Sequence, residues 1–132
     1  MDVCWEDAVR WGDADIVRDL LSRGIDPNVR DCYGQTGLML ATHAGHQAVV
    51  QLLIDHGVNL NLTAKFGLTA VMLAVIAGHK EIAQALARAG ADLTLRGTGV
   101  PGFAGKTAAD LAAVRGWNDL AIELAPDKQR MK

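Results

Sequence analysis

The sequence predicts an all-α solenoid of four helix–turn–helix units joined by short, hairpin-like turns. The chain has 132 residues, four times a period of about 33 that is typical of one class of helical repeat. Half of the residues are apolar and only 5% are aromatic, a composition that fits a helix-rich globular chain. The third observation is an internal match, because the sequence resembles itself when it is shifted by one such period.

The internal match defines the units. Residues 31–41 align with residues 64–74 and share a Gly-x-Thr turn followed by a Leu-Ala pair. Glycines at the ends of the expected helices recur at the same shift, and they are Gly12, Gly45, Gly78, Gly24, Gly57 and Gly90. Beyond them the pattern resumes later than this period requires, at Gly105–Thr107. The chain therefore has a first unit before residue 31, and five inserted residues before the last unit.

Each unit is predicted to hold two short helices. Gly34 and Gly67 can adopt the positive φ of a tight turn, and the threonine two residues later can cap the helix that follows. The threonines are Thr36, Thr69 and Thr107. A glycine ends this first helix, and a second helix such as His46–Asp55 carries Val49, Val50, Leu52 and Leu53 on one side. Residues 25–29 exemplify the extended, turn-rich excursion between units.

The predicted domain covers residues 1–125 and precedes a solvated tail at residues 126–132. Its units lie at about 1–30, 31–63, 64–96 and 102–125, with a loop insertion at 97–101. The outer units are expected to cap the stack, as a finite solenoid requires. Trp5 aligns with Leu38 and is predicted to be in the core, while Trp117 replaces the histidine that follows the corner glycine and is predicted to close the last unit.

These units resemble the ankyrin-repeat family over residues 1 to about 125. The family pattern is Asp-x-x-Gly-x-Thr-Pro-Leu-His-x-Ala, then Gly-His, then Leu-Leu-x-x-Gly-Ala-Asp-x-Asn. Asp31–Ala41, Gly45-His46 and residues 53–61 follow it closely. The resemblance implies a stack in which each unit buries its apolar faces against its neighbours. It also implies a role in binding other proteins.

The sequence departs from the family pattern at the Pro-Leu-His stretch. That stretch is replaced by Gly37-Leu38-Met39, Ala70-Val71-Met72 and Ala108-Ala109-Asp110. In the family the histidine hydrogen-bonds neighbouring turns, so Met39 and Met72 imply apolar packing in its place. Asp110 suits a last unit whose outer side faces water.

The resemblance further implies a binding surface, a concave groove lined by the turn tips and by the exposed side of each first helix. On this basis we expect the partner-binding residues to be Arg10, Trp11, Tyr33, Gln35, His43, Lys65, Phe66, Leu68, Ile76, Phe103, Lys106 and Arg115. Each unit contributes one aromatic residue to this set, and aromatic residues are frequent interface anchors. Alternatively, Tyr33 or Phe66 packs on a neighbouring turn, or Trp11 seals the first unit. The bases on this face favour a partner with some acidic character.

One loop contains the elements of a phosphate-binding motif. Residues 97–107 include a Gly-x-Gly-x-x-Gly, and Gly105-Lys106-Thr107 opens a helix, where an anion is favoured. However, a phosphate loop has four residues between its first glycine and the Gly-Lys-Thr, whereas Gly99 and Gly105 enclose five. We therefore interpret the segment as an inserted hairpin loop. A small enzyme or nucleotide binder that uses the Gly97–Thr107 loop is the most distant alternative.

No catalytic residue, cofactor or metal site is predicted. His46 and His79 occupy the repeat corners, His43-x-x-His46 straddles a glycine, and Cys4 lies far from Cys32 in the sequence. Ser22 is the only serine and has no catalytic partner in the sequence pattern. We expect both cysteines to stay reduced thiols. The chain is predicted not to be an enzyme.

Charge and hydropathy limit the classes of partner and the cellular compartment that we expect for this chain. The net charge of −2, without a strongly basic face, argues against nucleic-acid binding. The N-terminal residues do not form a signal peptide, and the longest apolar run, Ala70–Ala77, is too short to span a membrane. We therefore expect a cytoplasmic protein, monomeric by itself, that acts as a non-catalytic protein–protein interaction module. The alternative is a dedicated inhibitor or immunity-type protein that neutralises one enzyme or toxin.

Overall fold

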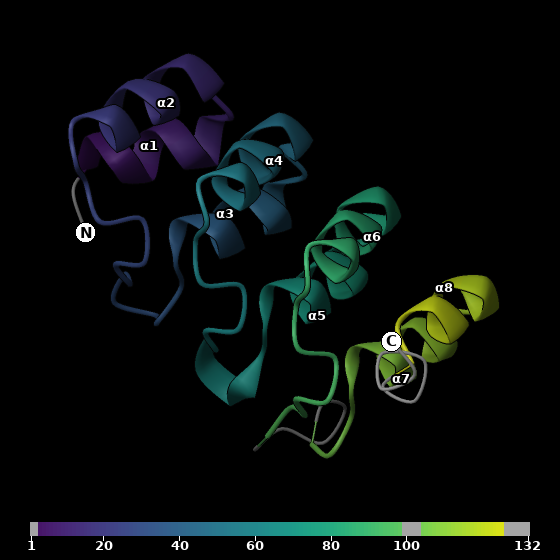
Figure 1. Ribbon diagram of the computed structural model, residues 1–132. Helices are drawn as coiled ribbons and strands as arrows, with labels where there is room; N and C mark the ends of the chain where they lie inside the picture. The colour runs from purple at the N-terminus through teal and green to yellow at the C-terminus, as the bar shows by residue number, and fades with distance from the viewer. Residues whose placement is uncertain (1–2, 99–103, 126–132) are drawn as a thin grey trace.

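Four helix pairs stand side by side in one elongated row (Figure 1). The computed structural model describes residues 3–98 and 104–125, so Phe103, the predicted tail and most of the insertion lie outside the described residues. The pairs are α1 (Val3–Trp11) with α2 (Ala14–Ser22), α3 (Gly37–Ala44) with α4 (Gln47–Asp55), α5 (Ala70–Ala77) with α6 (Lys80–Arg88), and α7 (Ala108–Val114) with α8 (Asn118–Glu123). The prediction of an all-α solenoid is confirmed.

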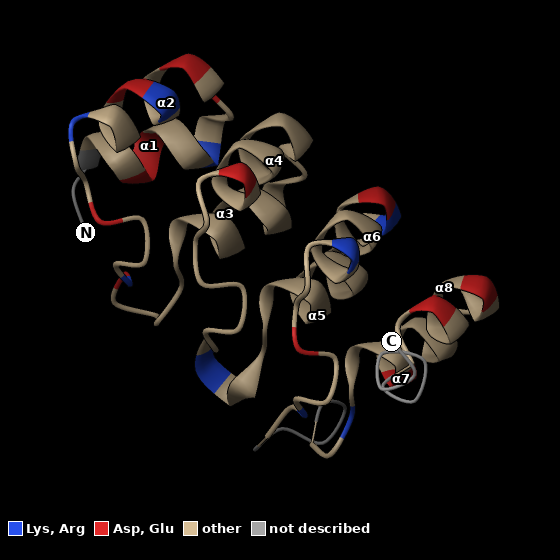
Figure 2. Ribbon diagram, in the orientation of Figure 1, with Lys and Arg blue, Asp and Glu red and all other residues tan. Residues whose placement is uncertain are grey.

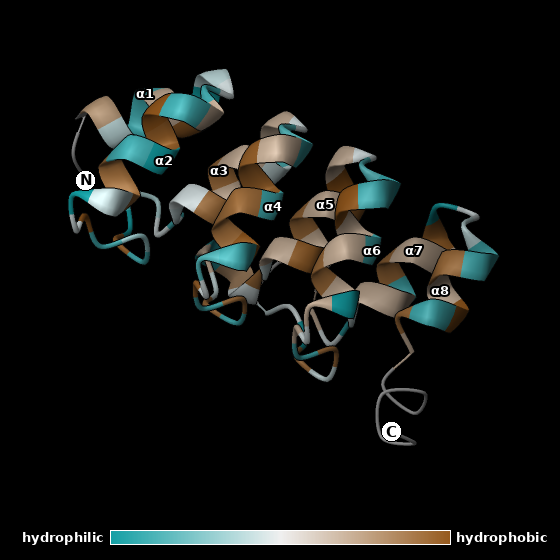
Figure 3. Ribbon diagram, turned by 45° about the horizontal axis from the view of Figure 1, so that its top comes forward, coloured by the Kyte–Doolittle hydropathy of each residue, from teal (hydrophilic) through white to brown (hydrophobic). Residues whose placement is uncertain are grey.

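The helices form two layers. The inner helices α1, α3, α5 and α7 contact one another in sequence, and so do the outer helices α2, α4, α6 and α8. Helix α5 is apolar along its whole length (Figure 3) because α3, α7 and α6 cover it on three sides. The loops that connect successive pairs project together beyond one end of the inner helices (Figure 1).

The local signals in the sequence act as predicted. In three inner helices, a buried threonine hydroxyl accepts a hydrogen bond of 3.3 Å from the backbone N–H three residues later. These caps are Thr36, Thr69 and Thr107. Helices α3 and α5 end at Gly45 and Gly78, whose φ values of 84° and 88° lie in the left-handed region that glycine tolerates.

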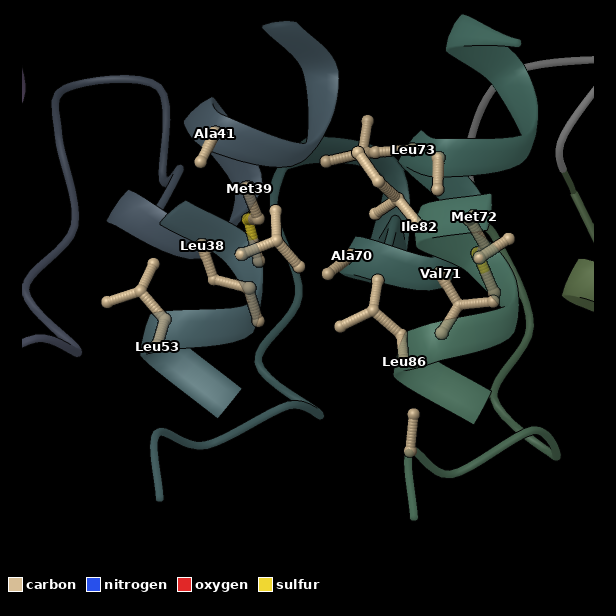
Figure 4. Packing of buried hydrophobic residues seen from close by; sticks show 14 of the residues in the cluster. Leu38, Met39, Ala41, Leu53, Ala70, Val71, Met72, Leu73, Ile82 and Leu86 are labelled. Carbon is tan, nitrogen blue, oxygen red and sulfur yellow. The ribbon is translucent and has the colours of Figure 1, made fainter. Parts of the chain in front are cut away.

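The core lies between the two layers, where Leu38 and Val71 of the inner helices pack towards the outer helices (Figure 4). Met39 and Met72 are each 1% exposed, which confirms the predicted apolar packing in place of the family histidine. The Met39 sulfur also accepts a 3.5 Å hydrogen bond from the Thr36 N–H, a contact that the sequence did not predict.

Trp5 is fully buried in this core, as predicted. Its ring explains why α3 begins with Gly37, where the aligned units have Ala70 and Ala108. A Cβ atom on Gly37 would lie only 2.8 Å from Cζ2 of Trp5. The large Trp5 ring of the first unit is therefore accommodated by a glycine, Gly37, in the second unit.

Side-chain amides link the loops that follow the outer helices. Asn28 Oδ1 accepts a 3.1 Å hydrogen bond from the Asn59 N–H, and Asn61 Oδ1 accepts one of 2.7 Å from the Asp92 N–H. Asp92 in turn accepts bonds from the hydroxyl and the N–H of Thr94, which lower the pKa of its carboxyl group. This chain of contacts holds successive loops at a fixed spacing.

The corners between inner and outer helices are also linked. Nε2 of His46 lies 2.7 Å from the Arg10 carbonyl oxygen, and Nε2 of His79 lies 3.1 Å from that of His43. Both histidines thus have the structural role predicted for them. In the last unit Trp117 is half-buried, and the Arg115 guanidinium stacks over its ring at 4.9 Å.

Candidate protein-binding groove

Two adjoining hollows run along the inner helices and the loop tips, and together we call them the tip groove. The first, of about 510 Å³, is lined by Arg10, Trp11, Asp31, Tyr33, Gln35, Leu40, His43 and Ala44. The second, of about 310 Å³, is lined by Tyr33, Gln35, Ala64, Lys65, Phe66, Leu68 and Leu73. Tyr33 and Gln35 line both hollows, so one continuous surface links the first three units.

The first hollow combines two exposed aromatic rings with a neutralised cation. Trp11, the last residue of α1, is 80% exposed and Tyr33 is 67% exposed. The Arg10 guanidinium forms a 2.8 Å ion pair with Glu6 and a looser contact of 3.9 Å with Asp31. Arg10 is therefore already paired and presents little free positive charge to a partner.

Asp31 stabilises the backbone of the loop tip that carries Tyr33. Its Oδ1 atom accepts hydrogen bonds of 2.9 Å from the N–H groups of Tyr33 and Gln35. Its Oδ2 atom is buried and has no hydrogen-bond donor among the described residues. The Tyr33 ring is thus exposed on a rigid support rather than on a loose loop.

The second hollow is more apolar. It is built around the 3₁₀ turn at Lys65–Gly67, where Phe66 is half-buried against the core. The Lys65 ammonium lies 5.1 Å from the centre of the Phe66 ring, an arrangement in which the ring face attracts the cation. Leu68 and Leu73 add aliphatic side chains to the lining.

Most of the predicted site residues lie in the tip groove. The eight that line it are Arg10, Trp11, Tyr33, Gln35, His43, Lys65, Phe66 and Leu68. Ile76 packs partly against the core instead, and Lys106 is half-buried in the next loop. Phe103 lies outside the described residues.

Arg115 belongs to the corner of the last unit rather than to either hollow. Its Nη2 atom lies 2.9 Å from the position that a Cβ on Gly78 would occupy. The rings of His46 and His79 lie over Gly12 and Gly45 in the same way. Because Trp117 replaces the corner histidine, the guanidinium takes its place over the glycine.

The sequence interpretation missed several groove residues. Asp31 stands three residues before a turn glycine, a position where aspartate commonly accepts backbone N–H groups. Leu40 and Leu73 line the two hollows at equivalent positions of successive units. The repeat register therefore contained the signal for both leucines, although a lining role for apolar residues is hard to distinguish from a core role.

The loop with phosphate-motif elements uses its backbone donors internally. The Gly105 N–H donates to the Gly97 carbonyl at 2.9 Å, and the Gly97 N–H donates to that of Lys106 at 2.9 Å. The Thr107 N–H donates to Asp110 at 3.0 Å. These bonds use the described backbone donors at the two ends of the loop within the chain itself, so they are not free to hold a phosphate.

Side chains that commonly bind metals are dispersed in the described part of the chain. Over residues 3–98 and 104–125, no three histidine, cysteine, aspartate or glutamate side chains gather closely enough to bind a metal ion. Within the same ranges, each helix is too short or too polar to cross a bilayer. Cys4 and Cys32 are both exposed thiols.

The helix pairs and the repeated loop tips define a helical-repeat scaffold with a groove beside the tips. A family model described as ankyrin repeats (3 copies) matches residues 6–97. The chain belongs to the ankyrin-repeat family, as its motifs indicated. Ankyrin repeats are generally protein–protein interaction modules and are typically non-catalytic. No curated protein matches the chain.

Proposed function

We propose that this protein is a non-catalytic module that holds a partner protein in the tip groove. One observation carries the proposal: Trp11 and Tyr33 expose most of their surface to solvent within the same hollow. Large exposed aromatic side chains leave apolar area in water unless a partner covers them. In a family whose members generally bind proteins, such a pair of rings supports an interface anchor.

The groove is preorganised for binding. The backbone carbonyl next to Trp11 is held by His46, and the backbone of Tyr33 is held by Asp31. Association then orders few additional groups, so that little conformational entropy is lost. The partner gains the aromatic contacts without first having to restructure the loops.

The decisive experiment compares a groove variant with a matched control. Trp11→Ala combined with Tyr33→Ala removes two exposed rings from the first hollow. The control, Ile16→Ala with Ile122→Ala, removes two apolar side chains that are 47% and 64% exposed on the outer helices. We expect the groove variant to weaken partner binding by ~2 kcal/mol or more, about thirtyfold, and the control to leave binding unchanged.

Binding is measured by affinity capture from the native lysate, followed by calorimetric titration of the captured partner. Phe66 is left intact because its ring is half-buried and its loss would also affect stability. Equal binding by the folded groove variant and the wild type would disprove the assignment. A single captured enzyme that loses activity in the complex would identify the alternative, a dedicated inhibitor.

A further inference from the structure

The charge along the tip groove is graded. At its Trp11 end, Arg10 is paired with Glu6 at 2.8 Å. At its Phe66 end, the exposed Lys65 forms no ion pair with any carboxylate in the part of the chain that the structure describes. With Asp31, which lines the first hollow, the Trp11 end has two carboxylates for one base, so the groove becomes positive only towards the third unit.

Three further bases extend this positive end, and with Lys65 we call them the basic edge: Arg30, Arg96 and Lys106. Arg30 donates to the Thr63 carbonyl at 2.8 Å, and Arg96 donates to the Gly105 carbonyl at 2.6 Å. Neutral carbonyl oxygens do not cancel the charge of a guanidinium. Among described residues, none of the four bases forms an ion pair with a carboxylate.

The basic edge lies directly beside the second hollow. The Thr98 N–H donates to the Phe66 carbonyl at 2.6 Å, which joins the Arg96–Thr98 segment to the 3₁₀ turn. Figure 2 shows basic residues on that turn and on the loop before α7, whereas α8 carries only acidic charges and α6 carries one acid and two bases. An apolar hollow thus opens next to several unneutralised cations.

We infer that the tip groove binds an extended acidic segment of its partner protein. An apolar side chain of that segment enters the hollow between Tyr33 and Phe66. Neighbouring aspartate or glutamate residues of the segment lie over the basic edge. The general role of the family in protein binding and the net charge of −2 favour a protein segment over nucleic acid. This inference rests on the proposed function and adds the chemistry of the partner.

The test is a selection of binding peptides from a random display library on the immobilised full-length chain. We expect the selected peptides to carry aspartate or glutamate next to a large apolar residue. Lys65→Glu should lower the affinity for the selected peptides about tenfold, because one attraction is replaced by one repulsion. Raising the salt concentration should lower the affinity of the wild type for these peptides as well.

Lys80→Glu is the matched control. Lys80 is on the outer helix α6, lines neither hollow and forms no ion pair among the described residues. Its reversal changes the net charge by the same amount and should alter affinity less than about twofold. An equal loss in both variants would reveal a non-specific charge effect and overturn the inference, as would displacement of the peptides by a short oligonucleotide.

The variant Tyr33→Ala distinguishes a failure of the acidic-segment inference from a failure of the proposed groove function. Selected peptides without an excess of acidic residues that still lose binding in Tyr33→Ala would overturn the acidic segment and leave the groove function standing. Peptides that bind Tyr33→Ala as well as the wild type would overturn the placement in the groove. Failure to select any peptide would overturn this inference, while the capture experiment would still decide the proposed function.

Discussion

Two loop tips in the same repeat register, residues 31–35 and 64–68, close their turns with the same backbone bonds. The Gly34 N–H donates to Asp31 at 3.0 Å, and the Gly67 N–H donates to Ala64 at 3.1 Å. Across the base of each turn, a second bond of 2.9 Å or 2.8 Å joins the first residue to the fifth. The pattern of backbone hydrogen bonds is therefore repeated although only the glycine is shared.

The side chains stabilise these two tips differently. Asp31 accepts two N–H groups within its own tip, whereas Ala64 has no side-chain acceptor. Phe66 has a φ of 65°, which is unfavourable for a residue with a Cβ, and Tyr33 does not. The second tip is instead tied to the next loop through the bond from Thr98 to Phe66. One tip is held locally and the other by its neighbour.

The largest effect on stability is expected from removing Asp31, the side-chain acceptor of the first tip. Asp31→Ala should lower the free energy of unfolding by ~2 kcal/mol, because two backbone N–H groups lose their partner. Asp31→Asn is the control, since its Oδ1 atom can accept the same two bonds, and it should cost less than about 1 kcal/mol. Urea unfolding measures both. Similar losses in the two variants would show that the bonds to Oδ1 do not stabilise the tip.

The strain at Phe66 predicts a reversal of sign between the two tips. Glycine tolerates a positive φ better than alanine, so Phe66→Gly should be more stable than Phe66→Ala by ~1 kcal/mol. At Tyr33, where φ is not positive, Tyr33→Gly should be less stable than Tyr33→Ala by a similar amount, about 0.5–1 kcal/mol. Thermal unfolding of the four variants tests this. The same sign at both positions would contradict the proposed difference in strain.

The glycine and threonine signals were predictable because each acts through local backbone geometry. Gly45 and Thr36 have the same role in any unit, so the repeat pattern identified them without knowledge of their neighbours. The strain at Phe66 was not predictable, because the aligned Tyr33 stands in the same pattern with a different φ. The Phe66 carbonyl is bonded to Thr98 of the next loop, a contact that the repeat pattern does not contain.

The groove was predictable in outline and its charge only in part. Long side chains such as Arg10 and Arg115 can reach several partners, and the sequence does not say which is chosen. Arg10 reaches Glu6 one turn earlier in its own helix, whereas Arg115 stacks on Trp117. Neither adds an unpaired cation to the two hollows, so the positive charge is confined to the basic edge, of which Lys65 and Lys106 were expected and Arg30 and Arg96 were not.

The smallest effect on stability is expected from giving the second tip the side-chain acceptor that the first tip has. Ala64→Asp places a carboxylate where it can accept the N–H groups of Phe66 and Leu68, as Asp31 accepts those of Tyr33 and Gln35. The gain should be ~0.5 kcal/mol, because the tip is already held by the neighbouring loop and part of the benefit is redundant. Ala64→Asn, which offers the same acceptor without the charge, separates hydrogen bonding from attraction to Lys65. Urea unfolding in which Ala64→Asp is no more stable than the wild type would show that the strained Phe66 prevents the second tip from adopting the geometry of the first.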